Sequence, residues 1–471
     1  MRLFSSLVCC SLLAACVLAL GCIGDSGDDD GEGAASPADL LRLHPENPRY
    51  FLFEGKPTVL ITSGEHYGAL INDDFDYERY LDELAEFGLN QTRVFSGSFI
   101  EARDKFVVGY RNPLAPRPDG LVSPWPVTEG GKFDLEAWNP RYFQRLRDFV
   151  AEAEKREIVV ELVLFSALYE YERWDASPFN PANNVNGVES IAPTRLYTLD
   201  NEQVLRYQDD LVRKLVSEVR SFGNIYFEVI NEGYAEPAHA TDAWQTHIIE
   251  TIEEAEAGLP YQHLIARNYD HTEPVTGTHP SVSVHNFHYQ RDPGQYGNLD
   301  GVLAFDETGF QGIGDDPYRT DAWYFMLSGG GAYSNLDWSF TPDHEDGSFQ
   351  VPPGTPGGGG DSIRRQLSVL KRFLERFEFT RMSPMHGIVK RAPAGATFRV
   401  LADPGRAYAI YLAGGRPGPL VLDLEKGRYQ AQWVATANGR VASEERFAHP
   451  GGPRSISPPP YEEDIALAIE R

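Results

Sequence analysis

Beyond residue 22 the chain contains no cysteine. All four cysteines, Cys9, Cys10, Cys16 and Cys22, lie near the beginning of a sequence of 471 residues. The folded part of the protein therefore cannot form a disulfide bond or a thiolate metal site, whatever compartment it occupies.

Positive charge is also scarce. The chain has 42 lysine and arginine residues against 69 aspartate and glutamate residues, a formal net charge of −27. Nucleic acids and anionic lipid surfaces attract basic proteins, so this balance argues against nucleic acid as a partner and against unaided docking on a membrane. It does not disfavour a neutral sugar.

The first residues carry a long apolar run. Arg2 supplies a positive charge, and residues 3–20 are mostly apolar. This order is typical of a secretory signal, and the run is short for a membrane-spanning helix. We expect residues 1–22 to be a lipoprotein-type signal peptide, with an uncleaved membrane anchor as the alternative.

Two of the cysteines are candidates for lipidation. Residues 13–16, LAAC, fit the bacterial lipobox pattern better than residues 19–22, ALGC, but Cys22 lies where the apolar run ends. A mature chain that began at Cys16 would keep several exposed apolar residues, so we favour Cys22. Residues 23–38 are rich in aspartate and glycine and are expected to form an acidic flexible tether.

These features predict an exported bacterial lipoprotein of the cell envelope, on the periplasmic or surface face of a membrane, or a secreted protein. Membrane contact would be made only through the N-terminal lipid anchor. The sequence leaves the oligomeric state open.

From residue 39 strand-like and helix-like segments alternate. About eight strand–helix units predict an α/β protein, a (β/α)8 TIM barrel, over residues 39–385. The pattern is weakest after the fifth strand, where little separates it from the sixth. The predicted strands are residues 58–62, 89–95, 158–165, 225–230, 263–266, 282–289, 302–305 and 332–340, and the predicted helices are residues 74–87, 141–155, 201–221, 243–257, 321–328 and 362–377.

Three long loops follow predicted strands, at residues 96–134, 166–199 and 341–361. On one face of a barrel they would wall a groove. The glycine-rich piece 352–360 is expected to be a mobile loop tip rather than a domain linker, because a helix of the barrel follows it.

After the barrel the pattern changes to short, partly alternating strands separated by Gly and Pro turns. Residues 408–412, 419–424, 429–433 and 465–469 are the clearest of these strands. They predict a small C-terminal antiparallel β-sandwich over residues 390–471.

Two of the predicted barrel strands end in carboxylates. The apolar run 225–230 is followed by Asn231 and Glu232, and the run 302–305 is followed by Asp306 and Glu307. The C-terminal ends of barrel strands are where such folds place their chemistry. Two carboxylates about 5–5.5 Å apart cleave a glycosidic bond with retention, one as nucleophile and one as acid, and burial and like charge can raise the acid's pKa.

At this point the chain resembles the clan A retaining glycoside hydrolases. The resemblance implies Glu232 as acid/base, Glu307 as nucleophile, and Asn231 as a hydrogen-bonding partner of the sugar 2-hydroxyl. Arg93, in LNQTRVF, is similar to the arginine near the nucleophile. The segment VHNFHYQ offers His285, His288 and Tyr289 for contact with the nucleophile, and Tyr289 is the choice, although the His-x-Tyr pattern of family 5 is not reproduced.

More specifically, the chain resembles cellulase-like (family 5) and apiosidase-like barrels that carry a collagen-binding-type β domain at the C-terminus. NPRYFLFEGKPTVLITSGEHYG, DAWYFMLSGGGAYSNLDWSF and the C-terminal strands carry this resemblance. It extends over most of the chain from Leu41.

Each candidate has a structural alternative. Glu232 could be a helix-start carboxylate. Glu307 could serve only in a structural salt bridge, and Asp306 competes with it for the catalytic assignment. Arg93 could form only an ion pair at the barrel end. His66 could line the sugar site or belong to a packed loop. Trp338 could stack on a sugar or pack in the core.

His285 and His288 resemble a metal-binding pair but lack a third ligand, so neither a metal nor a cofactor is expected.

The sequence thus predicts a retaining glycoside hydrolase that cleaves O-glycosidic bonds of a poly- or oligosaccharide by double displacement. The alternatives are a non-catalytic surface glycan-binding lipoprotein, an adhesin that works through its C-terminal domain, and a transglycosylase with the same residues.

Overall fold

The computed structural model describes residues 40–101, 115–169 and 171–471. The expected signal peptide (1–22), the tether (23–38), and with them Cys16 and Cys22, lie outside the described residues. Among the helices of the described part, none combines the length and the apolar character needed to cross a bilayer.

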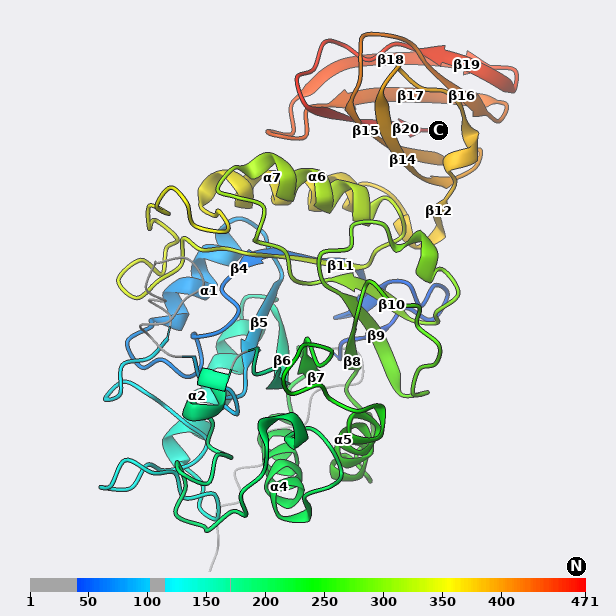
Figure 1. Ribbon diagram of the computed structural model, residues 1–471. Helices are drawn as coiled ribbons and strands as arrows, with labels where there is room; N and C mark the ends of the chain where they lie inside the picture. Colours follow the sequence, from blue (N-terminus) through cyan, green and yellow to red (C-terminus); the bar gives the residue numbers. More distant parts are fainter. Residues whose placement is uncertain (1–39, 102–114, 170) are drawn as a thin grey trace, which may run out of the picture. The chain divides into compact units, whose positions relative to one another are not determined.

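Eight parallel strands form the central sheet (Figure 1). From β5 to β11 each strand pairs with the next in chain order, and β11 pairs with β4, so that only β4 and β5 lack a regular ladder between them. The predicted (β/α)8 barrel is thereby confirmed. The strands are β4 (Leu60–Gly64), β5 (Gln91–Phe95), β6 (Val159–Ser166), β7 (Ile225–Asn231), β8 (Ile265–Tyr269), β9 (Val282–Phe287), β10 (Val302–Phe305) and β11 (Ala332–Leu336).

Asn90 connects the two strands that lack a regular ladder, β4 and β5. Its side-chain oxygen accepts from the Ile61 amide at 3.0 Å, its amide group donates to the Val59 carbonyl at 2.9 Å, and its backbone N–H donates to Ile61 at 3.3 Å. One asparagine thus satisfies backbone groups that a strand neighbour would otherwise pair.

Helices surround the sheet, but not at every crossover. Residues 270–281 and 288–301, which follow β8 and β9, are all described and contain no α-helix, only the 3-10 turn Pro293–Tyr296. The gap noted in the sequence is therefore a real departure from a full set of helices. The helices are α1 (Tyr77–Glu86), α2 (Pro140–Glu154), α3 (Tyr171–Ala176), α4 (Glu202–Val219), α5 (Asp242–Ala255), α6 (Asp315–Met326) and α7 (Asp361–Glu375).

The inward-facing positions of the strands change character along the barrel. Because side chains alternate with a period of two, Val159 and Glu161 share one face of β6, and Tyr226 and Glu228 share one face of β7. The lower positions form an apolar cluster, whereas the next positions toward the C-terminal ends carry charge.

A hairpin at the start of the described chain packs on the apolar end of the barrel. It consists of β1 (Arg42–Leu43), β2 (Phe51–Phe53) and β3 (Lys56–Thr58), and Phe51 and Phe53 belong to the same apolar cluster as Val159 and Tyr226. The hairpin therefore closes the end of the barrel opposite the carboxylate-bearing strand tips.

The glycine-rich segment is packed, contrary to its expected role as a loop tip. Gly357 bridges to Gly312, and the Trp338 N–H donates to the Gly358 carbonyl at 3.1 Å. A Cβ added to Gly357 would lie 1.8 Å from the Gly309 carbonyl oxygen, so no larger residue fits there. The segment supports the loops that follow β10 and β11.

The C-terminal residues form two antiparallel sheets over an apolar core. One has six strands and the other has three, and the first strand of the larger sheet begins at Ser383, before the expected start at residue 390. The strands are β12 (Ser383–Pro384), β13 (Val389–Arg391), β14 (Ala396–Asp403), β15 (Ala407–Gly414), β16 (Leu420–Leu424), β17 (Gly427–Val434), β18 (Val441–His449), β19 (Gly452–Ile456) and β20 (Asp464–Glu470).

Candidate active site

Glu232 follows the last residue of β7. Its carboxylate oxygen Oε1 lies 3.0 Å from His288 Nδ1 and accepts a hydrogen bond from the Tyr234 hydroxyl at 3.3 Å. Its side chain keeps 12% exposure, so one part of the carboxyl group remains open to the barrel mouth.

Glu307 lies two residues after β10, and both of its carboxylate oxygens are held by donors. The Tyr289 hydroxyl donates to Oε1 at 2.9 Å, and Arg93 Nη1 donates to Oε2 at 2.9 Å. The residue is 9% exposed. Such contacts fix the carboxylate in one orientation.

The two glutamates meet at the barrel mouth. A carboxylate oxygen of Glu232, one of Glu307 and a ring nitrogen of His288 all lie within 4.8 Å of one another. In retaining glycosidases the two carboxyl groups are about 5–5.5 Å apart, and in inverting enzymes about 6.5–9.5 Å. The two glutamates are thus close enough to act on one bond.

Arg93, inside the barrel on β5, connects these groups. Its guanidinium donates to Glu228 Oε1 and to Asn231 Oδ1, each at 2.7 Å, in addition to Glu307. The side chain is completely buried. Asn231 is thus held by Arg93 through its oxygen, while its amide group donates to the Tyr169 hydroxyl.

A second group of carboxyl groups lies below the first, and two of its members, Glu161 and Glu228, were not selected from the sequence. Glu161, Glu228 and Asp306 are fully buried, and one oxygen of each lies within 4.8 Å of the others. Asn286 donates to Glu228 at 2.7 Å and also to Asp306. The available signal was a single charge inside each apolar run, VVELVLF and IYFEVIN.

The two glutamates of the mouth have opposite pKa shifts. Burial raises the pKa of Glu307, and the Glu232 charge adds to this, although His288 and Arg93 oppose it. Burial would also raise the pKa of Glu232, but the hydrogen bond and charge of His288 hold it below its usual value. The expected rise of the acid's pKa is therefore absent in the free protein, because His288 faces Glu232.

Strained backbone marks the same region. Glu232, Tyr289 and Tyr169 have φ values of 47°, 56° and 58°, in the left-handed region that non-glycine residues rarely adopt. Such conformations persist only where the surroundings enforce them, and they are concentrated at functional sites.

The two remaining histidine candidates, His66 and His285, differ in the groups that they contact. His66 is buried, its Nε2 lies 3.0 Å from the Ser334 hydroxyl, and burial together with the Arg93 charge lowers its pKa to about 3. It is therefore a neutral group near neutral pH. His285 instead faces the Asp300 carbonyl at 2.7 Å and belongs to neither carboxylate group.

Aromatic side chains form one wall of the mouth. Phe310, which the sequence analysis did not select, makes edge contacts with Tyr289 and Trp338 at centroid distances of 5.9 and 5.8 Å. Phe310 is 43% exposed and Tyr289 is 42% exposed, while Trp338 is half-buried and donates from Nε1 to the Gly309 carbonyl. The mouth thus offers aromatic ring surface to a ligand beside its carboxylates.

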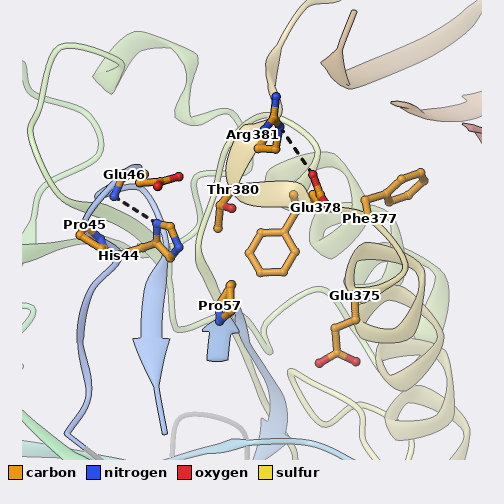
Figure 2. A pocket seen from close by; sticks show the side chains of 10 residues that line it. His44, Pro45, Glu46, Pro57, Glu375, Phe377, Glu378, Thr380 and Arg381 are labelled. Carbon is orange, nitrogen blue, oxygen red and sulfur yellow. Dashed lines mark hydrogen bonds and ion pairs between the residues drawn. The ribbon is translucent and has the colours of Figure 1, made fainter. Parts of the chain in front are cut away.

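A separate hollow of about 490 Å³ lies beside the N-terminal hairpin (Figure 2). His44, Pro57 and Phe377 line it, and its Arg381 and Glu378 pair with each other at 3.6 Å. None of its lining residues belongs to the strand-tip groups, so it is not a rival to the mouth.

No family model matches the chain, and no curated protein matches it. Among solved structures it is similar to a glycoside hydrolase family 5 structure from Bacteroides vulgatus ATCC 8482, with 13% sequence identity and a TM-score of 0.63 over 93% of this chain and 95% of that one.

A second structure, described as a glycoside hydrolase, has 14% identity and a TM-score of 0.61 over 92% of this chain and 97% of that one. At this level of identity the likeness concerns the fold. The chain therefore shares the fold of these two glycoside hydrolase structures over more than nine tenths of its length.

Proposed function

We propose that the protein is a retaining glycoside hydrolase that cleaves O-glycosidic bonds of a poly- or oligosaccharide. The observation that supports this best is the convergence of Glu232 and Glu307 within 4.8 Å at the strand tips. Exposed aromatic rings beside them offer a surface for a sugar. The shared fold adds a consistent framework.

The donors around Glu307 favour it as the nucleophile. Arg93 and Tyr289 hold its two oxygens, which orients the carboxylate and stabilises its charge before attack. Glu232 is the acid/base, since the cationic group in direct contact with it is a titratable imidazole, which can exchange a proton with it, while the Arg93 charge acts from farther away.

In the first step a Glu307 oxygen attacks the anomeric carbon while Glu232 gives its proton to the departing oxygen. This forms a covalent glycosyl–enzyme ester. In the second step Glu232 removes a proton from water, and the water oxygen displaces Glu307 from the anomeric carbon. In this scheme Asn231, whose oxygen is held by Arg93, hydrogen-bonds the sugar 2-hydroxyl once the substrate is bound.

The test is a screen of chromogenic glycosides and polysaccharides with the wild-type protein and the Glu307→Gln variant. Hydrolysis is expected in the wild type, with a loss on the order of 10⁴-fold or more in the variant. The configuration of the first-formed product, followed by NMR, should be retained. Product analysis with an acceptor sugar would identify transglycosylation.

A non-catalytic glycan-binding protein would give the opposite result. Neither protein would hydrolyse any substrate, and Glu307→Gln would bind glycans as the wild type does. Binding of collagen or glycan that survives mutation of both glutamates, and that is lost on substitution of exposed residues in the C-terminal sheets, would favour the adhesin alternative.

We also propose export and lipidation at Cys22, with Cys16 as the alternative, on the sequence features alone. Metabolic labelling with a fatty acid should be lost in Cys22→Ser and kept in Cys16→Ser. The reverse pattern would move the assignment to Cys16, and labelling of neither wild type nor variants would contradict lipidation.

A further inference from the structure

His288 lies between three carboxyl groups in the buried upper part of the barrel. Its Nδ1 is 3.0 Å from Glu232 Oε1 and 3.8 Å from Glu307 Oε2, and its Nε2 is 3.1 Å from Asp306 Oδ1. The contact of Nδ1 with Glu232 is a hydrogen bond, whereas Nε2 and Asp306 Oδ1 lie at ion-pair distance without hydrogen-bond geometry. With a carboxylate at ion-pair distance on each side, the imidazolium form of the ring is favoured electrostatically.

The charges around this ring do not balance unless protons are retained. Five carboxyl groups against two cationic groups leave a buried charge of −3 if all are ionised, which low polarity strongly disfavours. The ionisable groups that face the ring or its neighbours come from several elements. They are Arg93 from β5, Glu161 from β6, Tyr226 and Glu228 from β7, Glu232 and Tyr234 after β7, Tyr289 after β9, Asp306 and Glu307 after β10, Tyr169 after β6, and His66 after β4.

Glu161 is the group best placed to keep a proton. Its nearest cationic atom is Arg93 Nε at 3.9 Å, its Oε2 accepts from Gln91 at 3.0 Å, and its Oε1 has no hydrogen-bond partner. Glu228, in contrast, accepts a hydrogen bond from Arg93 Nη2 at 2.7 Å. Burial and the charges of Asp306 and Glu228 raise the pKa of Glu161 well above its usual range.

Asp306 keeps its charge for the opposite reason. Burial alone would raise its pKa, but Arg93 Nε at 3.5 Å and His288 at 3.1 Å hold the pKa far below its usual value. A fixed negative charge therefore lies on the side of the ring that faces away from Glu232.

We propose that Asp306 is a positioning residue that acts through His288: its carboxylate keeps the imidazole protonated and facing Glu232, while uncharged Glu161 lies beside Asp306. The inference rests on the proposed function for its catalytic meaning. It assigns to Asp306 control of the pH range over which the Glu232–His288 pair holds the proton for glycoside cleavage.

The pair shares one proton, which moves without any other change in bonding. On Nδ1 the proton forms an imidazolium that faces the Glu232 carboxylate. Transferred to Glu232, it leaves a neutral ring and a carboxylic acid that can protonate the departing oxygen. The Asp306 charge raises the pH at which the pair loses this proton to solvent.

The experiment is an NMR titration of the imidazole groups in ¹⁵N-histidine-labelled full-length protein, in which the His288 signals are assigned by their absence in His288→Gln. In the wild type His288 should remain protonated well above pH 6.5, the ordinary histidine pKa. In Asp306→Asn its pKa should fall by about one unit or more. In Glu161→Gln, which replaces a neutral group by a neutral group, the pKa should not change.

Titration of wild-type His288 at or below pH 6.5 would overturn the proposal even if Asp306→Asn fails to fold. An unchanged pKa in folded Asp306→Asn would do the same, and so would a Glu161→Gln shift as large as that of Asp306→Asn. No substrate is needed for these readouts, so they stand apart from the proposed function.

With a substrate in hand, the alkaline limb of kcat/KM should move to lower pH in Asp306→Asn and stay in place in Glu161→Gln. A His288 shift without any movement of that limb would overturn the catalytic part of the proposal.

Discussion

In the C-terminal sandwich the side chains between the two sheets are apolar, and Ile410, Leu412, Leu467 and Trp433 are each at most 3% exposed. In the upper half of the barrel the equally buried inward positions are ionisable, with Arg93 at their centre. Two interiors of one chain are thus filled by opposite kinds of side chain.

An apolar interior stabilises a fold without regard to pH, because its contribution comes from surface removed from water. An ionisable interior must overcome the desolvation of each charge, and replacement by packed apolar residues would often be neutral or stabilising. The barrel interior is therefore best understood as a requirement of chemistry, which the sandwich does not share.

The largest expected effect tests whether the barrel mouth serves chemistry rather than stability. Glu232→Gln should lower the hydrolysis of glycosides with poor leaving groups by about 10²- to 10⁴-fold, because the departing oxygen would lose its proton donor. Activated aryl glycosides should lose far less, and the unfolding midpoint should change little. Equal losses on both kinds of substrate would contradict the acid role.

A paired substitution compares the two interiors directly. Arg93→Met removes the donor of Glu228, Asn231 and Glu307 and should cost about 3–5 kcal/mol of unfolding free energy. Leu412→Ala in the sandwich should cost a similar amount, about 2–5 kcal/mol, through a cavity.

Urea unfolding at pH 7 and pH 5 separates the two. The loss in Arg93→Met should shrink at pH 5, where its carboxyl partners take up protons, while the loss in Leu412→Ala should stay constant. Leu412→Ala should also keep its activity per folded molecule. A pH-independent loss in both variants would remove the distinction between the interiors.

The smallest effect concerns the aromatic wall. Phe310→Ala should raise KM by a few-fold to about tenfold, with kcat nearly unchanged. This factor corresponds to the free energy of one aromatic contact. Its matched control is Ile313→Ala in the same loop, which is 47% exposed and is expected to leave KM unchanged. Steady-state kinetics on an oligosaccharide provide the measurement, and equal effects of both substitutions would argue against a specific role of the ring.

The barrel could be predicted because the spacing of apolar residues alternates along the chain between that of strands and that of helices. Glu232 and Glu307 could be selected because each follows an apolar run. Glu161 and Glu228 were not selected, since the register of the strands decides which of their side chains point into the barrel. That register follows from pairings between distant segments, which no local pattern contains.

Other differences have equally local causes. Strand β18, VASEERFAH, was missed because an edge strand with charged residues lacks an apolar signal. The glycine-rich segment was read as a loop tip because its composition is that of flexible chains, whereas here the absence of a Cβ permits close packing. The Asp306–His288 contact joins loops after different strands and could not be inferred from spacing.

The described crossovers after β8 and β9 contain no α-helix, and stacked aromatic rings lie at these strands. The Phe287 ring stacks on Tyr296 with 3.8 Å between the ring centroids, and Tyr269 stacks on Phe287 at 5.6 Å. His288 and Tyr289, which hold the two glutamates, continue directly from β9. Local opening of the barrel should therefore begin next to the candidate active site. On warming, the activity should be lost at a lower temperature than the one at which the whole protein unfolds.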